Sequence, residues 1–357
     1  MSAPTIAEAI ARPHNAFSAM RLALALAVVV SHAFSVATGD PAAEPLARAT
    51  GFALGEHAVN GFFAVSGFLV TMSMDRRGAR DYVIARALRI LPGLVAATLL
   101  VSLVLGAALT RLPLAEYYAA PELRRFILGT LTTFKSNAAL PGLFEANPYR
   151  SPLGTVWTLK YETLCYFGVL VSGVLGLLRV RWLSLALVAG LAVALVAAQI
   201  AHPDLPKGTE TAFRLPMIFA GGGALYLWRD RVRLSPWWLL ALPAALLLQG
   251  TPLYRSALFL TEAYAAIGIA LLPALGRPRL DPPADLSYGV YLYGWPIQQV
   301  LHAFWPQGSG WALLGPSIIL ALGVAALSWY AIEKPALGLK ARALGRRTLG
   351  TIEPAGP

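Results

Sequence analysis

The stretch that decides the fold is Met20-Arg-Leu-Ala-Leu-Ala-Leu-Ala-Val-Val-Val-Ser-His-Ala-Phe34, an apolar run interrupted by Arg21 and His32. A helix needs roughly 20 mostly apolar residues to cross the hydrocarbon core of a bilayer. The run and its flanks reach that length, so we predict a membrane-spanning helix near 16–36. No persuasive small-residue cleavage site accompanies it, which favours a retained helix over a signal peptide.

The rest of the chain repeats this pattern. Of its 357 residues, 57% are hydrophobic and 13% are charged, too little polar surface to cover a soluble globule. We therefore predict an all-α, polytopic membrane bundle of about ten transmembrane helices. The predicted spans lie near 16–36, 51–74, 88–110, 152–178, 182–200, 212–228, 235–249, 255–275, 285–304 and 310–331.

The net charge of +11 reflects membrane topology better than nucleic-acid binding, because the basic residues lie in short loops between apolar spans. Placing the N-terminus and the even-numbered connections in the cytoplasm gives that side 18 Lys and Arg residues against nine outside. Both termini are then cytoplasmic. We expect one membrane domain over 1–335 and a short basic tail over 336–357. The longest connection, 111–151, is expected outside, with a short interfacial helix from Glu122 to Phe134.

Arg21 and His32 are the first candidates for chemistry. Eleven residues at about 100° each come to about 20° past three turns, so both side chains share one helix face about 16 Å apart and can line one cavity. An ionisable residue within a span is costly unless it meets water, a counter-charge or a ligand. The plain alternatives are a packing histidine and a snorkelling arginine. The single cysteine, Cys165, cannot form an intramolecular disulfide and is expected to be a structural thiol.

Two further segments carry small or basic residues. Asn60-Gly-Phe-Phe-Ala-Val-Ser66-Gly-Phe-Leu69 has small residues spaced to let helices approach closely. Arg86 and Arg89 are three apart, so they share a helix face at the predicted cytoplasmic edge. There they suit phosphate groups, or else simply anchor the helix.

The segment Trp157-Thr-Leu-Lys160-Tyr161-Glu162-Thr-Leu-Cys-Tyr166 places a carboxylate inside a predicted span. Glu162 and His32 are expected at similar depth, where the carboxylate could orient the histidine or receive its charge. Lys160 is the competing partner for Glu162. A last aromatic segment, Ser287-Tyr288-Gly-Val-Tyr291-Leu-Tyr-Gly294-Trp-Pro296, could be an ordinary interfacial belt.

Taken in order, these segments resemble the acyltransferase family 3 membrane proteins, which O-acylate sugars of bacterial surface glycans. The matching positions are Arg21 with His32, FFAVSGF at 62–68, Arg86 and Arg89 with Pro92, WTLKYETLCY at 157–166, SYGVYLYGWP at 287–296 and IEKP at 332–335. Two positions depart from the family pattern. Gly294 stands where many members carry a second histidine, and residues 17–20 replace a frequent Asp-Gly before the arginine. No role of a second histidine carries over.

The resemblance implies a transferase of the bacterial inner membrane. Its co-substrate would be a cytoplasmic acyl-coenzyme A, with acetyl favoured, and it would hold no tightly bound cofactor and no metal. The acceptor would be a sugar hydroxyl of a cell-surface or lipid-linked glycan, of O-antigen or exopolysaccharide type. His32 would act as general base with Glu162 as its partner. We assign donor binding to Arg21, Arg86, Arg89 and Tyr288, and possible lining of the site to Asn60, Ser66, Trp157, Tyr161 and Tyr291.

Other hypotheses remain open at this point. An acyl-enzyme could form on His32 or Ser66. Buried Arg, His and Glu also mark substrate pathways and proton relays, so a transporter or flippase for a lipid-linked glycan is the alternative from another class, although no repeat symmetry is evident. A catalytically inactive membrane scaffold is the third.

Overall fold

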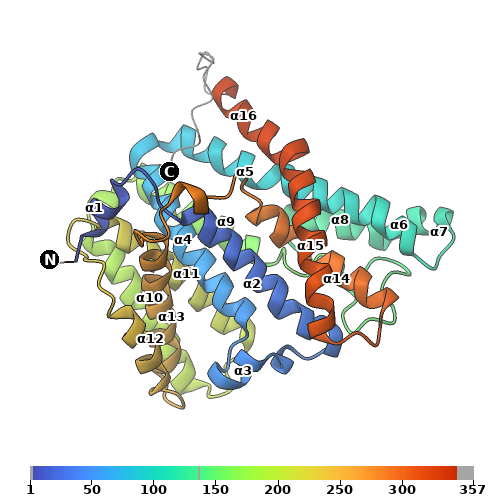
Figure 1. Ribbon diagram of the computed structural model, residues 1–357, viewed down its shortest axis with the longest axis horizontal. Coiled ribbons are helices and arrows are strands. Elements are labelled where there is room, and N and C mark those ends of the chain that lie inside the picture. Colours follow the sequence, from blue (N-terminus) through green and yellow to red (C-terminus); the bar gives the residue numbers. More distant parts are fainter. Residues whose placement is uncertain (1–2, 136, 344–357) are drawn as a thin grey trace.

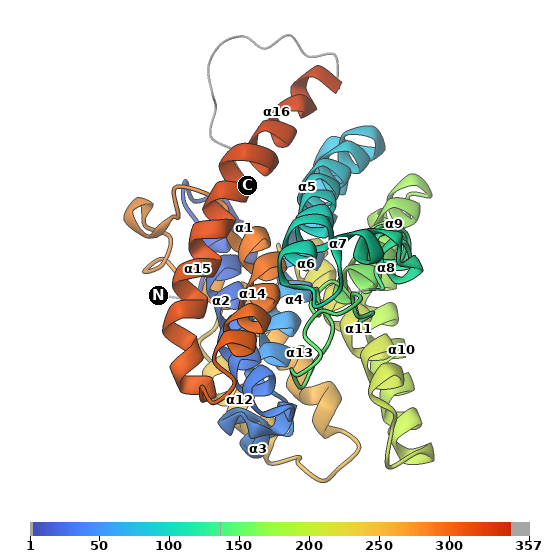
Figure 2. The same cartoon turned by 90° about the vertical axis from the view of Figure 1, so that its right-hand side faces the viewer.

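The computed structural model describes residues 3–135 and 137–343; among these, 74% are helical and no strand forms. The α-helices in chain order are α1 (Ile6–Ile10), α2 (Phe17–Thr38), α3 (Pro45–Thr50), α4 (Leu54–Arg77), α5 (Ala79–Leu99), α6 (Gly106–Leu109), α7 (Leu114–Ala119), α8 (Pro121–Thr133), α9 (Thr158–Val174), α10 (Trp182–Ala201), α11 (Lys207–Leu227), α12 (Trp238–Leu246), α13 (Tyr254–Ala270), α14 (Ser287–Phe304), α15 (Gly310–Ser328) and α16 (Lys334–Ala343). Figures 1 and 2 show how they pack. The all-α prediction is confirmed.

Within the described residues, five helices are long and apolar enough to cross a membrane. They are Phe17–Thr38, Leu54–Arg77, Ala79–Leu109, Trp182–Ala201 and Gly310–Lys340. The third joins α5 and α6 through a π-helical segment, Leu100–Leu105, and the fifth joins α15 and α16 through another, Trp329–Glu333. Large apolar side chains such as Leu187, Val193 and Ile319 point outward, as the hydrocarbon of a bilayer requires. The protein is therefore a helical membrane protein, and the count of ten spans stays a prediction.

Two predicted spans are shorter than expected. Near 152–178 the helix begins only at Thr158, because residues 152–157 form turns. Near 235–249 the helix Trp238–Leu246 has nine residues, or about 14 Å, less than half of a hydrocarbon core of about 30 Å. Hydropathy alone does not show where turns interrupt an apolar run. The predicted helix at Glu122–Phe134 is present as α8.

Helix α4 lies at the centre of the bundle and packs most closely on α11. A side chain at Gly67 would collide with the backbone carbonyl of Phe219, and one at Gly222 with that of Ala64. Only glycine at both positions lets the two backbones come so close. The prediction that the small residues of 60–69 permit close helix packing is confirmed.

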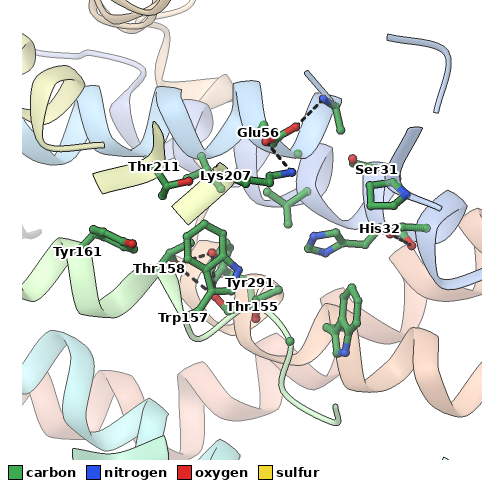
Figure 3. Close-up of a pocket in the computed structure, with 18 of the residues that line it drawn as sticks. Ser31, His32, Glu56, Thr155, Trp157, Thr158, Tyr161, Lys207, Thr211 and Tyr291 are labelled. Atoms are coloured by element: carbon green, nitrogen blue, oxygen red, sulfur yellow. Dashed lines mark hydrogen bonds and ion pairs between the residues drawn. The ribbon is translucent and has the colours of Figure 1, made fainter. Parts of the chain in front are cut away.

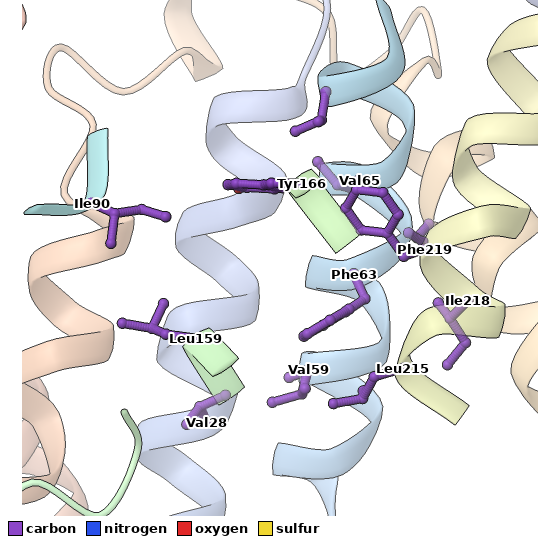
Figure 4. Packing of buried hydrophobic residues seen from close by; sticks show 14 of the residues in the cluster. Val28, Val59, Phe63, Val65, Ile90, Leu159, Tyr166, Leu215, Ile218 and Phe219 are labelled. Atoms are coloured by element: carbon purple, nitrogen blue, oxygen red, sulfur yellow. The ribbon is translucent and has the colours of Figure 1, made fainter. Parts of the chain in front are cut away.

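The same helix joins the buried apolar core. Figure 4 shows Val59 and Phe63 of α4 between Val28 of α2 and Leu215 of α11, and these four residues are at most 8% exposed. Two acidic side chains fix the start of α4: Glu44 accepts the backbone N–H of Leu54 at 2.6 Å, and Glu56 accepts that of Ala53 at 3.0 Å. The core thus fixes the positions of α2, α4 and α11 along one another. The polar residues on these helices therefore lie at defined depths in the bundle.

The two ends of the bundle carry different segments. In both views, α1 and α16 lie toward one end and α3 toward the other (Figures 1 and 2). The helix that ends in α16 passes through the predicted boundary at 335/336 without interruption, and Lys340 Nζ on it pairs with Asp81 Oδ1 of α5 at 2.6 Å. The predicted tail beyond residue 343 lies outside the described residues.

Candidate functional site

Three cavities follow one another through the bundle, and α4 lines all of them in the order of its residues. The first, which we call the His32 cavity, is lined by His32, Gly55, Glu56, Val59, Trp157, Lys207, Tyr291 and neighbours. The second, the Glu162 cavity, is lined by Arg21, Ser66, Arg86, Arg89, Glu162, Tyr166, Tyr288, Tyr291 and neighbours. The third, the Arg76 cavity, is lined by His14, Ser18, Arg21, Ser73, Arg76, Arg77, Arg86, Asp281 and neighbours.

Adjacent cavities share walls. Val59, Thr158 and Tyr291 line both the His32 and the Glu162 cavity. Arg21, Leu69 and Arg86 line both the Glu162 and the Arg76 cavity. The volumes are about 420, 90 and 440 Å³, so a small cavity lies between two large ones. The row runs from the α3 end of the bundle to the end that carries α1.

His32 projects into its cavity without a hydrogen-bond partner among the residues that the structure describes. Its ring stands edge-on against Trp295, with centroids 4.9 Å apart and planes at 90°. Trp295 is held in turn, because its indole N–H donates to the carbonyl of Ser151 at 2.7 Å. Figure 3 shows the His32 ring directed into the space between Lys207 and Glu56 on one side and Trp157 and Tyr291 on the other. A positioned histidine with a free ring nitrogen can take a proton from a hydroxyl.

The polar wall of the His32 cavity consists of paired charges. Lys207 Nζ lies 3.1 Å from Glu56 Oε1, and the almost fully buried Arg214, 1% exposed, lies 3.0 Å from Glu210 Oε1. Arg214 also approaches Glu56 at 3.9 Å. The two basic groups are matched by two carboxylates, so this wall offers hydrogen bonds without a net charge.

Aromatic rings form the opposite wall. Trp157 and Tyr161 stand edge-to-face with centroids 6.1 Å apart, and both line the cavity. Tyr149, in the loop before α9, lines it too and donates to the carbonyl of Gly39 at 3.1 Å. Burial, and then the Asp40 carboxylate nearby, raise the pKa of the Tyr149 phenol above its usual value, so that phenol stays neutral at physiological pH. Aromatic faces beside neutral polar groups suit a sugar ring.

Glu162 lies in the second cavity and contacts other partners than predicted. Its carboxylate accepts hydrogen bonds from Ser66 Oγ at 3.2 Å and from the Tyr166 hydroxyl. Lys160, the competing partner, lies over the Tyr161 ring instead, 6.0 Å from its centroid. The prediction that Glu162 orients His32 is therefore wrong in this structure, as is the pairing with Lys160.

The reason is depth. His32 lies beside Gly55, where an added Cβ would be 4.0 Å from His32 Nε2. Ser66, the partner of Glu162, is eleven residues further along α4, or about 16 Å of helix rise. A helix that began at residue 152 would place Glu162 at the depth of His32. Helix α9 begins instead at Thr158, deeper in the bundle, so Glu162 lies deeper as well. Glu162 thus shares its cavity with Arg21, and Arg21 and His32 line successive cavities, not the single one predicted.

Arg21 and Arg89 are held by a residue that the sequence analysis missed. Asp285 Oδ2 lies 2.9 Å from Arg21 Nη2 and 3.0 Å from Arg89 Nη2. Ser287 Oγ donates to Asp285 Oδ1 at 2.7 Å and fixes the carboxylate. The structure therefore brings the predicted donor-binding residues Arg21, Arg86, Arg89 and Tyr288 into one cavity, with Asp285 as a counter-charge.

The remaining predicted lining residues divide between the sites. Trp157 and Tyr161 line the His32 cavity, Ser66 lines the Glu162 cavity, and Tyr291 lines both. Asn60 lines none of the three, which corrects its assignment. It is fully buried, where it donates to Glu262 Oε2 at 2.7 Å and accepts from Arg214 Nη1 at 3.3 Å. An amide surrounded by charged partners in the core braces the bundle and cannot reach a ligand.

Some site residues carried a signal in the sequence. Glu210 and Arg214 are four apart, a spacing that places them on one helix face and predicts an ion pair. Glu56 follows the start of a predicted span by five positions, an unusual place for a carboxylate. Asp285 had no local signal, because its partners come from α2 and α5.

Gly294, the departure noted in the sequence, has a packing role. A Cβ at this position would lie 2.6 Å from Val29 Cγ2. A side chain at this position would therefore require Val29 of α2 to shift. The neighbouring Gln298 secures the same contact by donating to the Val29 carbonyl at 2.7 Å.

Comparison with known proteins places this architecture in a family. The profile described as "Acyltransferase domain" matches residues 14–332, nearly the whole chain. The chain is 30% identical over 336 residues to the O-acetyl transferase of Shigella phage Sf6, covering 90% of this chain and 95% of that protein. It is 29% identical over 376 residues to Nodulation protein 10 of Rhizobium leguminosarum bv. viciae, covering 93% and 96%. No solved structure matches it significantly.

Proposed function

Because this chain belongs to the acyltransferase family whose profile spans residues 14–332, we propose that it moves an acetyl group from acetyl-coenzyme A to a sugar hydroxyl of a surface or lipid-linked glycan. The relative from Shigella phage Sf6 is named an O-acetyl transferase, which favours acetyl and an oxygen acceptor. The donor enters from the cytoplasm and the acceptor from the opposite face of the bacterial inner membrane.

The row of three cavities along α4 is the observation that carries this proposal. A donor with a bulky charged end, a slender arm and an acyl group that meets the acceptor matches in order the large Arg76 cavity, the small Glu162 cavity and the large His32 cavity. Arg21 and His32 are about 16 Å apart along α2, a distance that an extended pantetheine arm can span. In the Glu162 cavity, the Glu162 carboxylate is placed to accept an amide N–H of that arm.

The acceptor sugar occupies the His32 cavity. Trp157 and Tyr161 provide an aromatic face for the ring, and Glu56, Lys207 and Thr211 provide hydrogen bonds. Since the charges of Lys207 and Arg214 are matched by Glu56 and Glu210, the cavity favours a neutral sugar.

His32 is the general base of this mechanism. A ring nitrogen takes the proton of the acceptor hydroxyl while its oxygen attacks the thioester carbonyl, and the carbon–sulfur bond then breaks. The proton passes from His32 to the departing coenzyme A thiolate. The Tyr291 and Thr158 hydroxyls, in the wall that the two cavities share, are hydrogen-bonded to each other at 2.6 Å, so one O–H proton of the pair is left. We propose that this proton leaves the Thr155 carbonyl, which lies within reach of both hydroxyls, and is donated to the thioester carbonyl oxygen as it becomes anionic.

Direct transfer is favoured over an acyl-enzyme on Ser66. Ser66 lies about 16 Å further along α4 than the position of His32, so the histidine cannot activate it. Its hydroxyl is also engaged with Glu162, at 3.2 Å.

Membrane vesicles that contain the protein, acetyl-coenzyme A and glycan from a deletion strain test the proposal. We expect release of free coenzyme A and a glycan mass gain of one acetyl group per modified repeat. Glycan that crosses the membrane without consumption of the thioester would instead indicate the transporter or flippase alternative. Vesicles without the protein are the control.

A further inference from the structure

The Arg76 cavity contains more positive charge than the structure neutralises. Arg76 and Arg77 lie at the end of α4, and Arg86 lies on α5. Within residues 3–135 and 137–343, no carboxylate forms an ion pair with any of these three arginines, whereas Arg21 and Arg89 share Asp285. Asp281 is the acidic residue of the lining. A chamber of about 440 Å³ with spare guanidinium groups suits a ligand with several negative charges.

Buried polar atoms in its wall also lack partners. Arg21 Nε, Ser73 Oγ and Arg86 Nε are shielded from solvent and make no hydrogen bond with any described residue. All three residues line this cavity. A buried donor that is left unpaired is destabilising, so such groups normally have a partner. Phosphate oxygens would supply acceptors to all three.

The N-terminus of α2 adds to the same field. Phe17 and Ser18, in the first turn of this 22-residue helix, line the cavity, and the first-turn N–H groups favour an anion. Among the residues that the structure describes, the arginines without ion pairs, the buried polar atoms without partners and the N-terminus of α2 are three separate observations. Each of them favours the binding of phosphate.

We propose that the Arg76 cavity binds the adenosine 3′-phosphate end of the acyl-coenzyme A donor, with Arg76 and Arg77 holding the 3′-phosphate and Arg21 and Arg86 the diphosphate. This assignment rests on the proposed function. Arg21 and Arg86 line both this cavity and the Glu162 cavity, so they meet the part of the donor that adjoins the pantetheine arm. Arg76 and Arg77 line the Arg76 cavity and not the Glu162 cavity. They are therefore placed at the end of the donor where the 3′-phosphate lies beyond the diphosphate.

Arg89 then has a different role from the one predicted. It does not line the Arg76 cavity, and its guanidinium contacts Asp285 and Ser287, the latter at 3.4 Å. It stabilises Asp285, which in turn orients Arg21. Arg89 is therefore a positioning residue for Arg21 in addition to lining the Glu162 cavity, and Arg76 and Arg77 become the contacts for the 3′-phosphate.

Binding of acetyl-coenzyme A and of acetyl-3′-dephospho-coenzyme A to the purified full-length protein tests the proposal without an acceptor. In phosphatidylcholine nanodiscs, we expect the wild type to bind the first at least about tenfold more tightly, as one charge-assisted phosphate contact would give. In the double variant R76Q/R77Q, we expect the two affinities to agree within about twofold. The matched control R179Q/R231Q removes two arginines from the same end of the bundle away from the cavity and should keep the wild-type ratio.

The outcomes separate this inference from the proposed function. A wild type that binds neither probe would refute acetyl-coenzyme A as donor. A wild type that binds both equally, or an R76Q/R77Q variant that keeps the preference, would overturn only the 3′-phosphate assignment. Phosphate chemistry is shared with anionic lipids, so nanodiscs with added phosphatidylglycerol form a second arm. If that lipid stabilises the wild type against thermal unfolding but not R76Q/R77Q, while the preference for the 3′-phosphate persists, the cavity is a lipid headgroup site and the proposal is wrong.

Discussion

The His32 cavity and the Arg76 cavity have nearly the same volume, about 420 and 440 Å³, but opposite chemistry. In the first, Lys207 and Arg214 are matched by carboxylates and aromatic rings form one wall. In the second, Arg76, Arg77 and Arg86 have no carboxylate partner in the described part of the chain. Two chambers of equal size on one helix can therefore recognise different ligands, because recognition depends on whether the charges are already neutralised.

We expect the largest effect on activity from a substitution of His32 itself. The substitution His32→Ala should lower kcat for acyl transfer by at least about a hundredfold, because it removes the group that takes the hydroxyl proton. The affinity for acetyl-coenzyme A should change by less than about threefold, since His32 lies in a different cavity from the phosphate contacts. Vesicle transfer and nanodisc binding measure the two quantities. His202→Ala, an exposed loop histidine, is the control, and a wild-type rate in His32→Ala would refute the assignment.

A smaller effect should be confined to the acceptor. Trp157→Ala removes one aromatic face of the His32 cavity and should raise the KM for glycan about tenfold, in line with the roughly 0.5–1.5 kcal/mol of a ring contact together with the loss of buried area. The KM for the donor should stay unchanged. Titration of glycan at saturating acetyl-coenzyme A gives the first value. Trp237→Ala, at an exposed tryptophan that lines none of the three cavities, should behave as wild type. A change in donor KM alone would contradict the division between the chambers.

We expect the smallest effect from a substitution of Asp285, which holds Arg21 between the Glu162 cavity and the Arg76 cavity. Asp285→Asn leaves Arg21 and Arg89 without their shared counter-charge, and their repulsion should turn Arg21 from its orientation. We expect the Kd for acetyl-coenzyme A to rise about three- to fivefold, or roughly 0.7–1 kcal/mol, typical of a lost positioning contact.

The matched change should act in the opposite direction. Asp281→Asn removes a carboxylate that faces the proposed phosphate site and should leave the Kd unchanged or lower it slightly. Equal Kd increases in both variants would indicate general damage to the loop and not a specific role of Asp285.

The sequence predicted most relations within one helix correctly, although the single cavity expected for Arg21 and His32 of α2 is two successive cavities. Arg86 and Arg89, three apart, do line the same cavity, and the glycines of 60–69 do bring α4 against its neighbour. The prediction failed where a relation joined two helices. Glu162 was counted from an assumed start of its span, but the turns at 152–157 place α9 deeper in the bundle, and its carboxylate reaches Ser66. Asp285 was missed because nothing near it in the sequence indicates that Arg21 and Arg89 converge on it.

By itself, the sequence determined that this chain is a helical membrane protein, that it belongs among acyltransferases, and that Arg21 and His32 share a helix face about 16 Å apart. These properties follow from composition and from the fixed rise and turn of a helix. Only the tertiary structure decided which charges are neutralised, which cavity each residue enters and how deep Glu162 lies. The physical reason is that depth and charge pairing depend on where separate helices begin and how closely they pack, and these depend on contacts between residues far apart in the chain.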